Sequence, residues 1–135
     1  MHATAAINKV IGAFFGAFDN RDGRVPTIDL LDSLFARASV VASHGVSGVA
    51  ICTVKDFAQP RIALLSSGRL LNFSEWETDA QTTVLGSLAV RRSRYSKSGQ
   101  LDGLPYAGSG TKFFQLALVE NEWRIVALSW ADDSG

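Results

Sequence analysis

The sequence is short of cysteine, of net charge and of long apolar runs, and each shortage excludes a class of protein. Cys52 is the single cysteine, so the chain cannot form an internal disulfide, and we expect it in the reducing cytoplasm. Lys and Arg together number 13, as do Asp and Glu, so no net field attracts a polyanion. The sequence therefore predicts neither a nucleic-acid partner nor a membrane partner.

The sequence also gives no support for a membrane span, a secretion signal or a metal site. Residues 38–54 carry no Asp, Glu, Lys or Arg, but serines, glycines and His44 interrupt them. The stretch is also shorter than the roughly 18–20 apolar residues that a span needs. Residues 10–18 have the length of a signal-peptide core but lead into Asp19–Asp22 without a small-residue cleavage site. No His, Cys or carboxylate cluster has metal-ligand spacing, so we expect no metal and no cofactor.

Composition and periodicity predict one domain over residues 1–135 that begins with helices. Hydrophobic residues make up 47% of the chain and charged residues 19%, enough to bury a core. Steps of three and four predict a first helix on Ile7, Val10, Ile11, Phe14, Phe15 and Phe18. A second short helix is predicted after Thr27. A third is predicted from a Thr53–Asp56 capping box, divided into two pieces at Pro60 and ended by Gly68.

The second half of the chain predicts strands. They are expected at residues 70–78, 82–97, 111–120 and 122–131, with a long glycine-rich hairpin loop before the third. A short strand at residues 38–43 is predicted to precede a loop with Gly45 and Gly48. Helices followed by antiparallel strands indicate an α+β fold, and the long strands predict a bent sheet that curls around a helix.

In the last two predicted strands, the alternate residues that point to each face of the sheet include many apolar side chains, so neither face has the polar pattern of a solvent-exposed face. One parity is uniformly large and apolar, while the other mixes small and polar side chains among bulky ones. This pattern predicts a curved sheet with a lined hollow on one side and a partner surface on the other.

Three segments, residues 14–23, 89–99 and 110–133, resemble the nuclear transport factor 2-like superfamily, which includes polyketide cyclase and ketosteroid isomerase relatives. The similarity is greatest where Trp123-Arg124-Ile125 on the closing strand follows a Phe-Gln strand. The resemblance implies helices packed on a strongly curved antiparallel sheet, a cone with an internal pocket, and a homodimer formed through the outer face of the sheet.

Pairing Val119 with Trp123 assigns the two faces of the last hairpin. The residues predicted to face the cone are Phe113, Gln115, Ala117, Ala127 and Ser129. The residues predicted to face outward and form the dimer interface are Phe114, Leu116, Val126, Leu128 and Trp130. An exposed patch of this size is uncommon on a soluble monomer, so we expect a two-fold homodimer.

The resemblance also implies that Ala89, Arg91, Ser93 and Tyr95 face the cavity. An inward arginine would suit a carboxylate, enolate or phenolate; alternatively, Arg91 pairs with a neighbouring carboxylate and only fixes the sheet. The expected ligand-binding residues are Trp76, Arg91, Ser93, Tyr95, Phe113, Gln115 and Ser129.

Catalytic residues stay unassigned. Glu75 and Glu77 share one face of a strand, and whether that face lines the cavity depends on a register that the sequence leaves open. His44 is either an idle loop residue or a base. Asp132 and Asp133 fall at a strand end, where capping or solvation is the ordinary role. No aspartate clearly faces the cavity, as an isomerase mechanism would require.

The sequence thus predicts a cone-fold protein that binds a small, partly apolar ligand. Any catalysis would be cofactor-free isomerisation, cyclisation or hydration. The alternative is a non-enzymatic dimerisation or association module that uses the outer sheet face. A ligand site should have a cavity of about 300 Å³ or more.

Overall fold

The computed structural model of the chain describes residues 2–134. Its helices are α1 (His2–Gly16), α2 (Leu31–Leu34) and α3 (Val54–Ser66), with short 3₁₀ turns η1 (Arg21–Gly23) and η2 (Ile28–Leu30). Its strands are β1 (Phe35–Gly45), β2 (Gly48–Thr53), β3 (Leu70–Leu85), β4 (Leu88–Leu101), β5 (Leu104–Val119) and β6 (Glu122–Asp132). No helix in this part of the chain is both long and apolar enough to cross a membrane.

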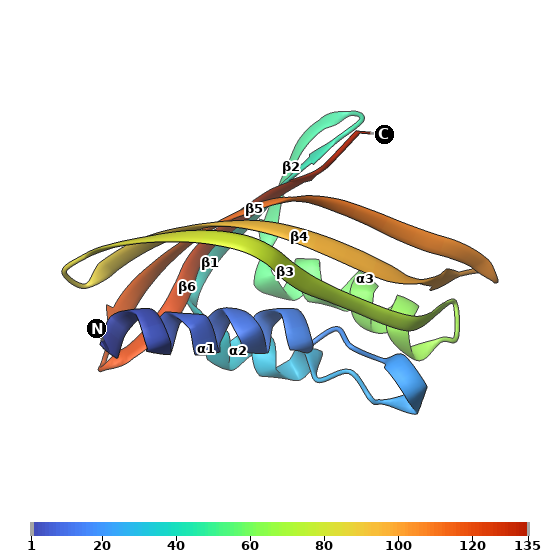
Figure 1. The fold of residues 1–135 in the computed structure, drawn as a ribbon, viewed down its shortest axis with the longest axis horizontal. Helices are drawn as coiled ribbons and strands as arrows, with labels where there is room; N and C mark the ends of the chain where they lie inside the picture. Colours follow the sequence, from blue (N-terminus) through green and yellow to red (C-terminus); the bar gives the residue numbers. More distant parts are fainter. Residues whose placement is uncertain (1, 135) are drawn as a thin grey trace.

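All six strands belong to one curved, open sheet in the order β2-β1-β6-β5-β4-β3. The helices lie together on its concave side (Figure 1), and the space-filling view shows α1 in blue running along the underside of β3. Parallel pairing of β1 with β6 makes the sheet mixed. The predicted α+β cone is therefore confirmed, although the sheet is not purely antiparallel.

The predicted apolar stripe of α1 forms the centre of the core. Ile7, Ile11 and Phe14 are almost fully buried. Phe14 makes edge-to-face contacts with Phe18 of the following turn and with Phe114 of β5, at ring-centre distances of 5.4 and 5.3 Å. Aromatic side chains of α1 and β5 thus pack against each other on the concave side of the sheet.

Helix α3 begins as predicted but is not divided. The Thr53 side chain accepts a hydrogen bond from the Asp56 amide, and Gly68 has a φ of +86° just past the end. Pro60 lies inside one continuous helix. Burial of Phe57 and Leu65 on the core side compensates for the hydrogen bond that a proline cannot make.

The hairpins are longer and tighter than predicted. β3 continues to Leu85 and turns at Gly86–Ser87, and β4 reaches β5 through Asp102–Gly103 instead of a long loop. The expected loop at Gly45 is also a tight turn, into the unpredicted strand β2. Asp102 and Gly103 both have positive φ, at 51° and 82°, the conformation that two-residue hairpin turns require.

The predicted face assignment of the last hairpin is wrong. Phe114, Leu116 and Leu128 are each only 1% exposed in the core, whereas Phe113 is 54% exposed. The hairpin closes through Val119 and Glu122, and its register shifts between Gln115 and Leu116.

This register shift is a β-bulge, and beyond a bulge the side chains of a strand change to the opposite faces of the sheet. On β6, Trp123 and Ile125 point inward before the bulge, and Leu128 and Trp130 point inward after it. Val126 lies at the parity change and is partly buried. The predicted dimer set, Phe114, Leu116, Val126, Leu128 and Trp130, is therefore not an exposed outer patch.

Candidate functional site

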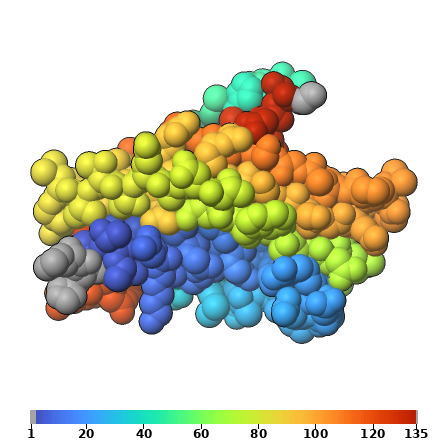
Figure 2. Space-filling model, viewed as in Figure 1, coloured from blue at the N-terminus to red at the C-terminus, as the bar shows by residue number. Residues whose placement is uncertain are grey.

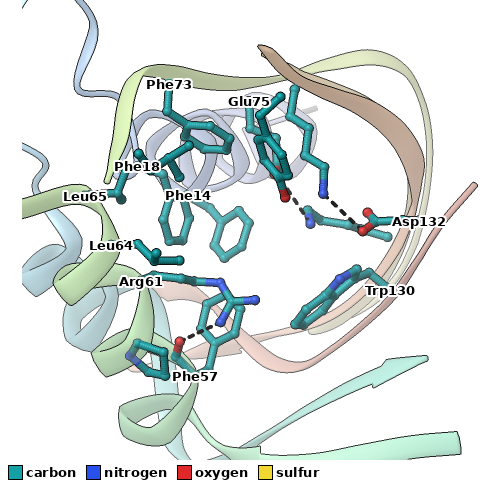
Figure 3. Close-up of a pocket in the computed structure, with 15 residues that line it drawn as sticks. Phe14, Phe18, Phe57, Arg61, Leu64, Leu65, Phe73, Glu75, Trp130 and Asp132 are labelled. Atoms are coloured by element: carbon teal, nitrogen blue, oxygen red, sulfur yellow. Dashed lines mark hydrogen bonds and ion pairs between the residues drawn. The ribbon is translucent and has the colours of Figure 1, made fainter. Parts of the chain in front are cut away.

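A cavity of about 250 Å³ lies between the concave sheet and the helices α1 and α3 (Figure 3). This volume is below the about 300 Å³ expected for a ligand site, so that expectation is not met and only a small molecule would fit. The lining combines aromatic and aliphatic walls with a few charged side chains. The lining residues are Phe14, Phe18, Phe57, Pro60, Arg61, Leu64, Leu65, Leu70, Phe73, Glu75, Lys97, Tyr106, Lys112, Trp130 and Asp132.

Aromatic rings from several elements border the cavity. α1 and α3 contribute phenylalanines, β5 contributes Tyr106, and β6 contributes Trp130. The rings of Phe57 and Trp130 meet edge to face, with their centres 5.4 Å apart. Walls of this kind favour a flat apolar ligand, because aromatic rings pack well edge to face and offset.

Arg61 extends from α3 into the cavity toward Trp130 (Figure 3). Its Cζ atom lies 4.1 Å from the centre of the Phe57 ring and 5.4 Å from that of Trp130. One guanidinium nitrogen donates to the Phe57 carbonyl at 2.9 Å. Among residues 2–134, no carboxylate forms an ion pair with Arg61. Burial lowers the pKa of Arg61, yet an arginine stays charged in proteins.

Lys112 of β5 is the most deeply buried cation of the site. It is 5% exposed, and its Nζ atom lies 3.0 Å from a carboxylate oxygen of Glu75 on β3. The same Nζ atom lies 4.1 Å from the centre of the Tyr95 ring and 5.0 Å from that of Trp130. Burial lowers the pKa of Lys112, although the Glu75 carboxylate opposes this shift.

Asp132, at the end of β6, joins two polar side chains of β4. It accepts hydrogen bonds from the Tyr95 hydroxyl and from Lys97 Nζ, the latter at 3.0 Å. Burial opposes ionisation of Asp132, but the two donors outweigh it and lower the pKa of the carboxyl. Burial, followed by the hydrogen bond to Asp132, raises the pKa of Tyr95. The tyrosine therefore stays protonated and acts as a hydrogen-bond donor.

Three cations and two carboxylates line the cavity. Glu75 neutralises Lys112 and Asp132 neutralises Lys97, which leaves the charge of Arg61 in excess. An anion is the ligand that balances this arrangement, and its position is set by the guanidinium. No three His, Cys, Asp or Glu side chains of the described part gather closely enough to hold a metal ion.

Solved structures with the same architecture cover almost the whole chain. A nuclear transport factor 2-like superfamily protein from Salmonella enterica superposes with a TM-score of 0.77 at 15% identity, over 100% of this chain and 95% of its own. A protein from Novosphingobium aromaticivorans, described as a candidate scytalone dehydratase, gives a TM-score of 0.77 at 13% identity, over 98% and 85%.

A candidate calmodulin-dependent kinase II association domain from Exiguobacterium sibiricum gives a TM-score of 0.76 at 5% identity, over 100% of this chain and 96% of its own. The chain has the nuclear transport factor 2-like fold. No protein-family model matches the sequence, and no curated protein matches it. At these identities the likeness shows the fold alone, so the function has to be argued from the site.

Within the nuclear transport factor 2-like fold, part of the predicted polar set does face inward. Arg91, Ser93 and Tyr95 are all buried on the concave side. None of the three lines the cavity, but Tyr95 donates a hydrogen bond to Asp132, which does.

Arg91 takes the structural alternative that the sequence left open. Its guanidinium donates to the Glu77 carboxylate at 3.0 and 2.5 Å and to Asn8 of α1 at 2.6 Å. Ser93 donates to the same carboxylate. These contacts tie α1 to the sheet beside the cavity, so Arg91 is not free to hold a ligand.

The other four predicted ligand residues do not line the cavity. Trp76 and Phe113 are 45% and 54% exposed. Ser129 pairs with Phe113 across the sheet, and Gln115 lies two residues beyond Phe113 on the same strand, so both occupy the convex face with Phe113. His44 is exposed near the β1–β2 turn. The prediction placed Phe113, Gln115 and Ser129 in the cone because it carried the wrong parity along β5 and β6, whereas Trp76 depended on the register of β3 with β4, in which it pairs with Ser96.

The sequence interpretation missed Arg61, Lys97, Lys112 and Asp132. A signal for Lys112 was present, since it shares a parity with Phe114 and Leu116 on a strongly apolar strand. A charge on a buried face is retained where it is paired or has a function. Arg61 gives no comparable signal, because one charged residue in a helix is ordinarily solvated.

Proposed function

We propose that the cavity binds a small aromatic carboxylate, with Arg61 as the anion-binding residue. The observation that carries the proposal is the Arg61 guanidinium, which lies over two aromatic rings and has no ion-pair partner among the described residues. A planar carboxylate matches the paired N–H groups of a guanidinium.

The lining supports a ligand of one ring with one acidic group. Aromatic side chains from α1, α3, β5 and β6 border a space of about 250 Å³. A flat ring can pack against Phe57 and Trp130 while its carboxylate meets Arg61. On the opposite wall, Glu75 and Asp132 offer acceptors for a hydroxyl group of the ligand.

Calorimetric titration with benzoate and its neutral isostere benzamide tests this proposal. We expect benzoate to bind more tightly, because benzamide lacks the charge that Arg61 recognises. Arg61→Gln should weaken benzoate binding by about tenfold to a hundredfold and leave benzamide nearly unaffected.

Arg92→Gln is the matched control, since Arg92 is an exposed arginine that pairs with Phe113 on the convex face. It should bind benzoate like the wild type. Equal affinity for benzoate and benzamide, or an Arg61→Gln protein that binds benzoate unchanged, would contradict the proposal.

Catalysis in the same cavity would be cofactor-free isomerisation, cyclisation or hydration. Lys112 and Glu75 line the space as an ion pair, and Asp132 of the lining accepts a hydrogen bond from Tyr95 behind it; such pairs support proton transfer. The candidate scytalone dehydratase of the same fold is consistent with this class of chemistry.

A second candidate function is association through the convex face of the sheet. Ile51, Val90 and Phe113 are 71%, 50% and 54% exposed on it, more apolar surface than a solvent face ordinarily carries. One protein of the same fold is described as a candidate association domain. The two functions use opposite faces of the sheet and are compatible in one molecule.

A further inference from the structure

We propose that Lys112 is a reactive amine that condenses with the carbonyl group of a small oxo acid. The inference rests on the proposed function in one respect: Arg61 would hold the carboxylate of the same molecule. It adds a covalent step and narrows the ligand to acids that also carry an aldehyde or ketone.

The position of Lys112 separates it from the exposed lysines of the chain. Its Nζ atom borders the cavity, next to the rings of Tyr95 and Trp130, with one carboxylate 3.0 Å away. Lys97, the other lysine of the lining, is bound to Asp132 at 3.0 Å. Burial opposes the charged form of Lys97, but the hydrogen bond to Asp132 and the interactions with Asp132 and Tyr106 together outweigh it and raise the pKa of Lys97. The two lysines are therefore expected to differ in reactivity.

A lysine attacks a carbonyl only as the neutral amine, so the proton must leave first. Burial among aromatic rings disfavours the ammonium form of Lys112 and lowers its pKa. Glu75, 3.0 Å from Lys112 Nζ, is in position to accept the proton before the amine attacks. An exposed lysine, with a pKa of about 10.4, is almost wholly protonated at pH 7.

Arg61 and Lys112 border the same indole ring from two elements. Their charged groups lie 5.4 and 5.0 Å from the centre of Trp130. One small molecule over that ring could place a carboxylate against Arg61 and a carbonyl carbon at Lys112. This shared wall is the reason to expect an oxo acid in place of a neutral aldehyde.

The reaction balances within the site. Glu75 takes one proton from the Lys112 ammonium, and the neutral nitrogen bonds to the carbonyl carbon as the C=O π bond breaks. Glu75 gives that proton to the oxygen and takes a second proton from the nitrogen, which gives a carbinolamine. Transfer of this second proton to the hydroxyl group releases water and leaves the protonated imine. No redox partner is required, and hydrolysis restores the free lysine.

Reductive trapping tests the proposal on the intact protein. The wild type is treated at pH 7 with 4-carboxybenzaldehyde and cyanoborohydride, which reduces an imine to a stable secondary amine. Mass spectrometry of the digested protein then locates the adduct. We expect it mainly on Lys112, with little on Lys97 or on the exposed Lys55.

Lys112→Arg keeps the positive charge beside Glu75 but cannot form an imine, so it should lose the adduct while remaining folded by circular dichroism. Lys55→Arg, at an exposed lysine outside the cavity lining, is the matched control and should keep the adduct on Lys112. An adduct spread evenly over the exposed lysines, or no adduct on Lys112, would overturn the proposal.

Benzaldehyde, which lacks the carboxylate, separates this inference from the proposed function. If Arg61→Gln slows trapping of 4-carboxybenzaldehyde but not of benzaldehyde, both hold. If benzoate binds through Arg61 and Lys112 is never trapped, the covalent step is wrong and the binding function stands. If both aldehydes are trapped equally and Arg61→Gln has no effect, the lysine is reactive and the carboxylate site is wrong.

Discussion

The charged side chains of this chain act chiefly in ion pairs, and the pair formed by Asp133 and Arg94 makes the stability of the fold depend on pH. The Asp133 carboxylate accepts two hydrogen bonds from Arg94, at 3.0 and 2.7 Å, and one from Ser109 at 2.7 Å. The hydrogen bonds from Arg94 and then Ser109 lower the pKa of Asp133 from 3.8 to about 2.

Because the folded state holds the ionised form, Asp133 contributes stability above about pH 4, and this contribution is lost as the pH falls through about 2. Asp133→Asn should therefore be less stable than the wild type at pH 6, with the difference disappearing near pH 2. Urea denaturation at a series of pH values measures this. A difference that does not change with pH would contradict the prediction.

For single residues, the sequence predicted which kinds of contact a side chain makes better than it predicted which face of the sheet the side chain occupies. The pairing of Arg91 with a carboxylate was one of two interpretations, and the contact with Glu77 confirms it. The roles of Lys112 and Asp132 were missed because a side chain at a given strand position lines the cavity in one register and faces solvent in the next. Bulges decide the register, and a bulge has no strong signature in a single sequence.

Among the connecting elements, the segment after α1 depends on one buried side chain. Asn20 is 8% exposed. Its amide nitrogen donates to the Leu65 and Leu70 carbonyls at 3.2 and 2.8 Å, and its oxygen accepts from the Phe73 amide at 2.7 Å. This side chain connects the end of α1 to α3 and β3 beside the cavity.

Asn20→Ala should lower the free energy of unfolding by about 2–3 kcal/mol, because it leaves buried backbone groups without partners. Asn20→Asp keeps the acceptor for Phe73 but removes both donors, and should cost nearly as much. Chemical denaturation with an unchanged m-value measures both effects. A loss below about 0.5 kcal/mol, the level of an ordinary surface change, would contradict this role.

The elements themselves were predicted where local chemistry determines them. The apolar stripe of α1, the Thr53 cap and the Gly68 stop all appear as expected. The long loop expected before residue 111 instead belongs to strands β4 and β5 and the tight turn between them, although it contains Pro105 and several glycines. Residues 104–109 lie beyond the pairing of β5 with β6, so they form a free edge where a proline is tolerated.

Gly110 had a second reason to occur in a strand. A Cβ atom there would lie 2.5 Å from the Ala131 carbonyl oxygen and would collide with the Tyr95 hydroxyl. The glycine therefore makes room for the hydrogen bond from Tyr95 to Asp132 at the cavity. A sequence interpretation that treats each glycine as a break cannot distinguish this use from a turn.

At the scale of the whole molecule, the order of elements predicted an α+β fold with a bent sheet, and the resemblance to the nuclear transport factor 2-like superfamily predicted the cone with helices packed on the sheet. Which side of the sheet forms the outer surface was not predictable, because both parities of β5 and β6 are apolar. The residues assigned to the cone, Phe113 and Ser129 among them, lie on the convex face, next to Ala42 and Ile51 in a continuous cross-strand row.

Because the two faces of the sheet are reversed, the expected dimer interface consists of other residues than those predicted. The reason for expecting a dimer, an exposed apolar surface on the sheet, still holds. Phe113 and Ile51 are exposed at opposite ends of the small side chains Ala42 and Ser129. A largely apolar row of this kind can pack against its own copy about a two-fold axis. We therefore predict a homodimer of twice the 14.5 kDa chain mass, with Phe113 in its interface.

Phe113→Asp should shift the light-scattering mass from dimer to monomer, because pairing about a two-fold axis brings two like charges into an apolar contact. Val46→Asp is the matched control, since Val46 is fully exposed at the β1–β2 turn and carries the same change away from the row. Benzoate binding should survive in the Phe113→Asp monomer, as the cavity lies on the opposite face. A wild-type protein that is monomeric at micromolar concentration would contradict the dimer and leave the concave cavity as the functional surface.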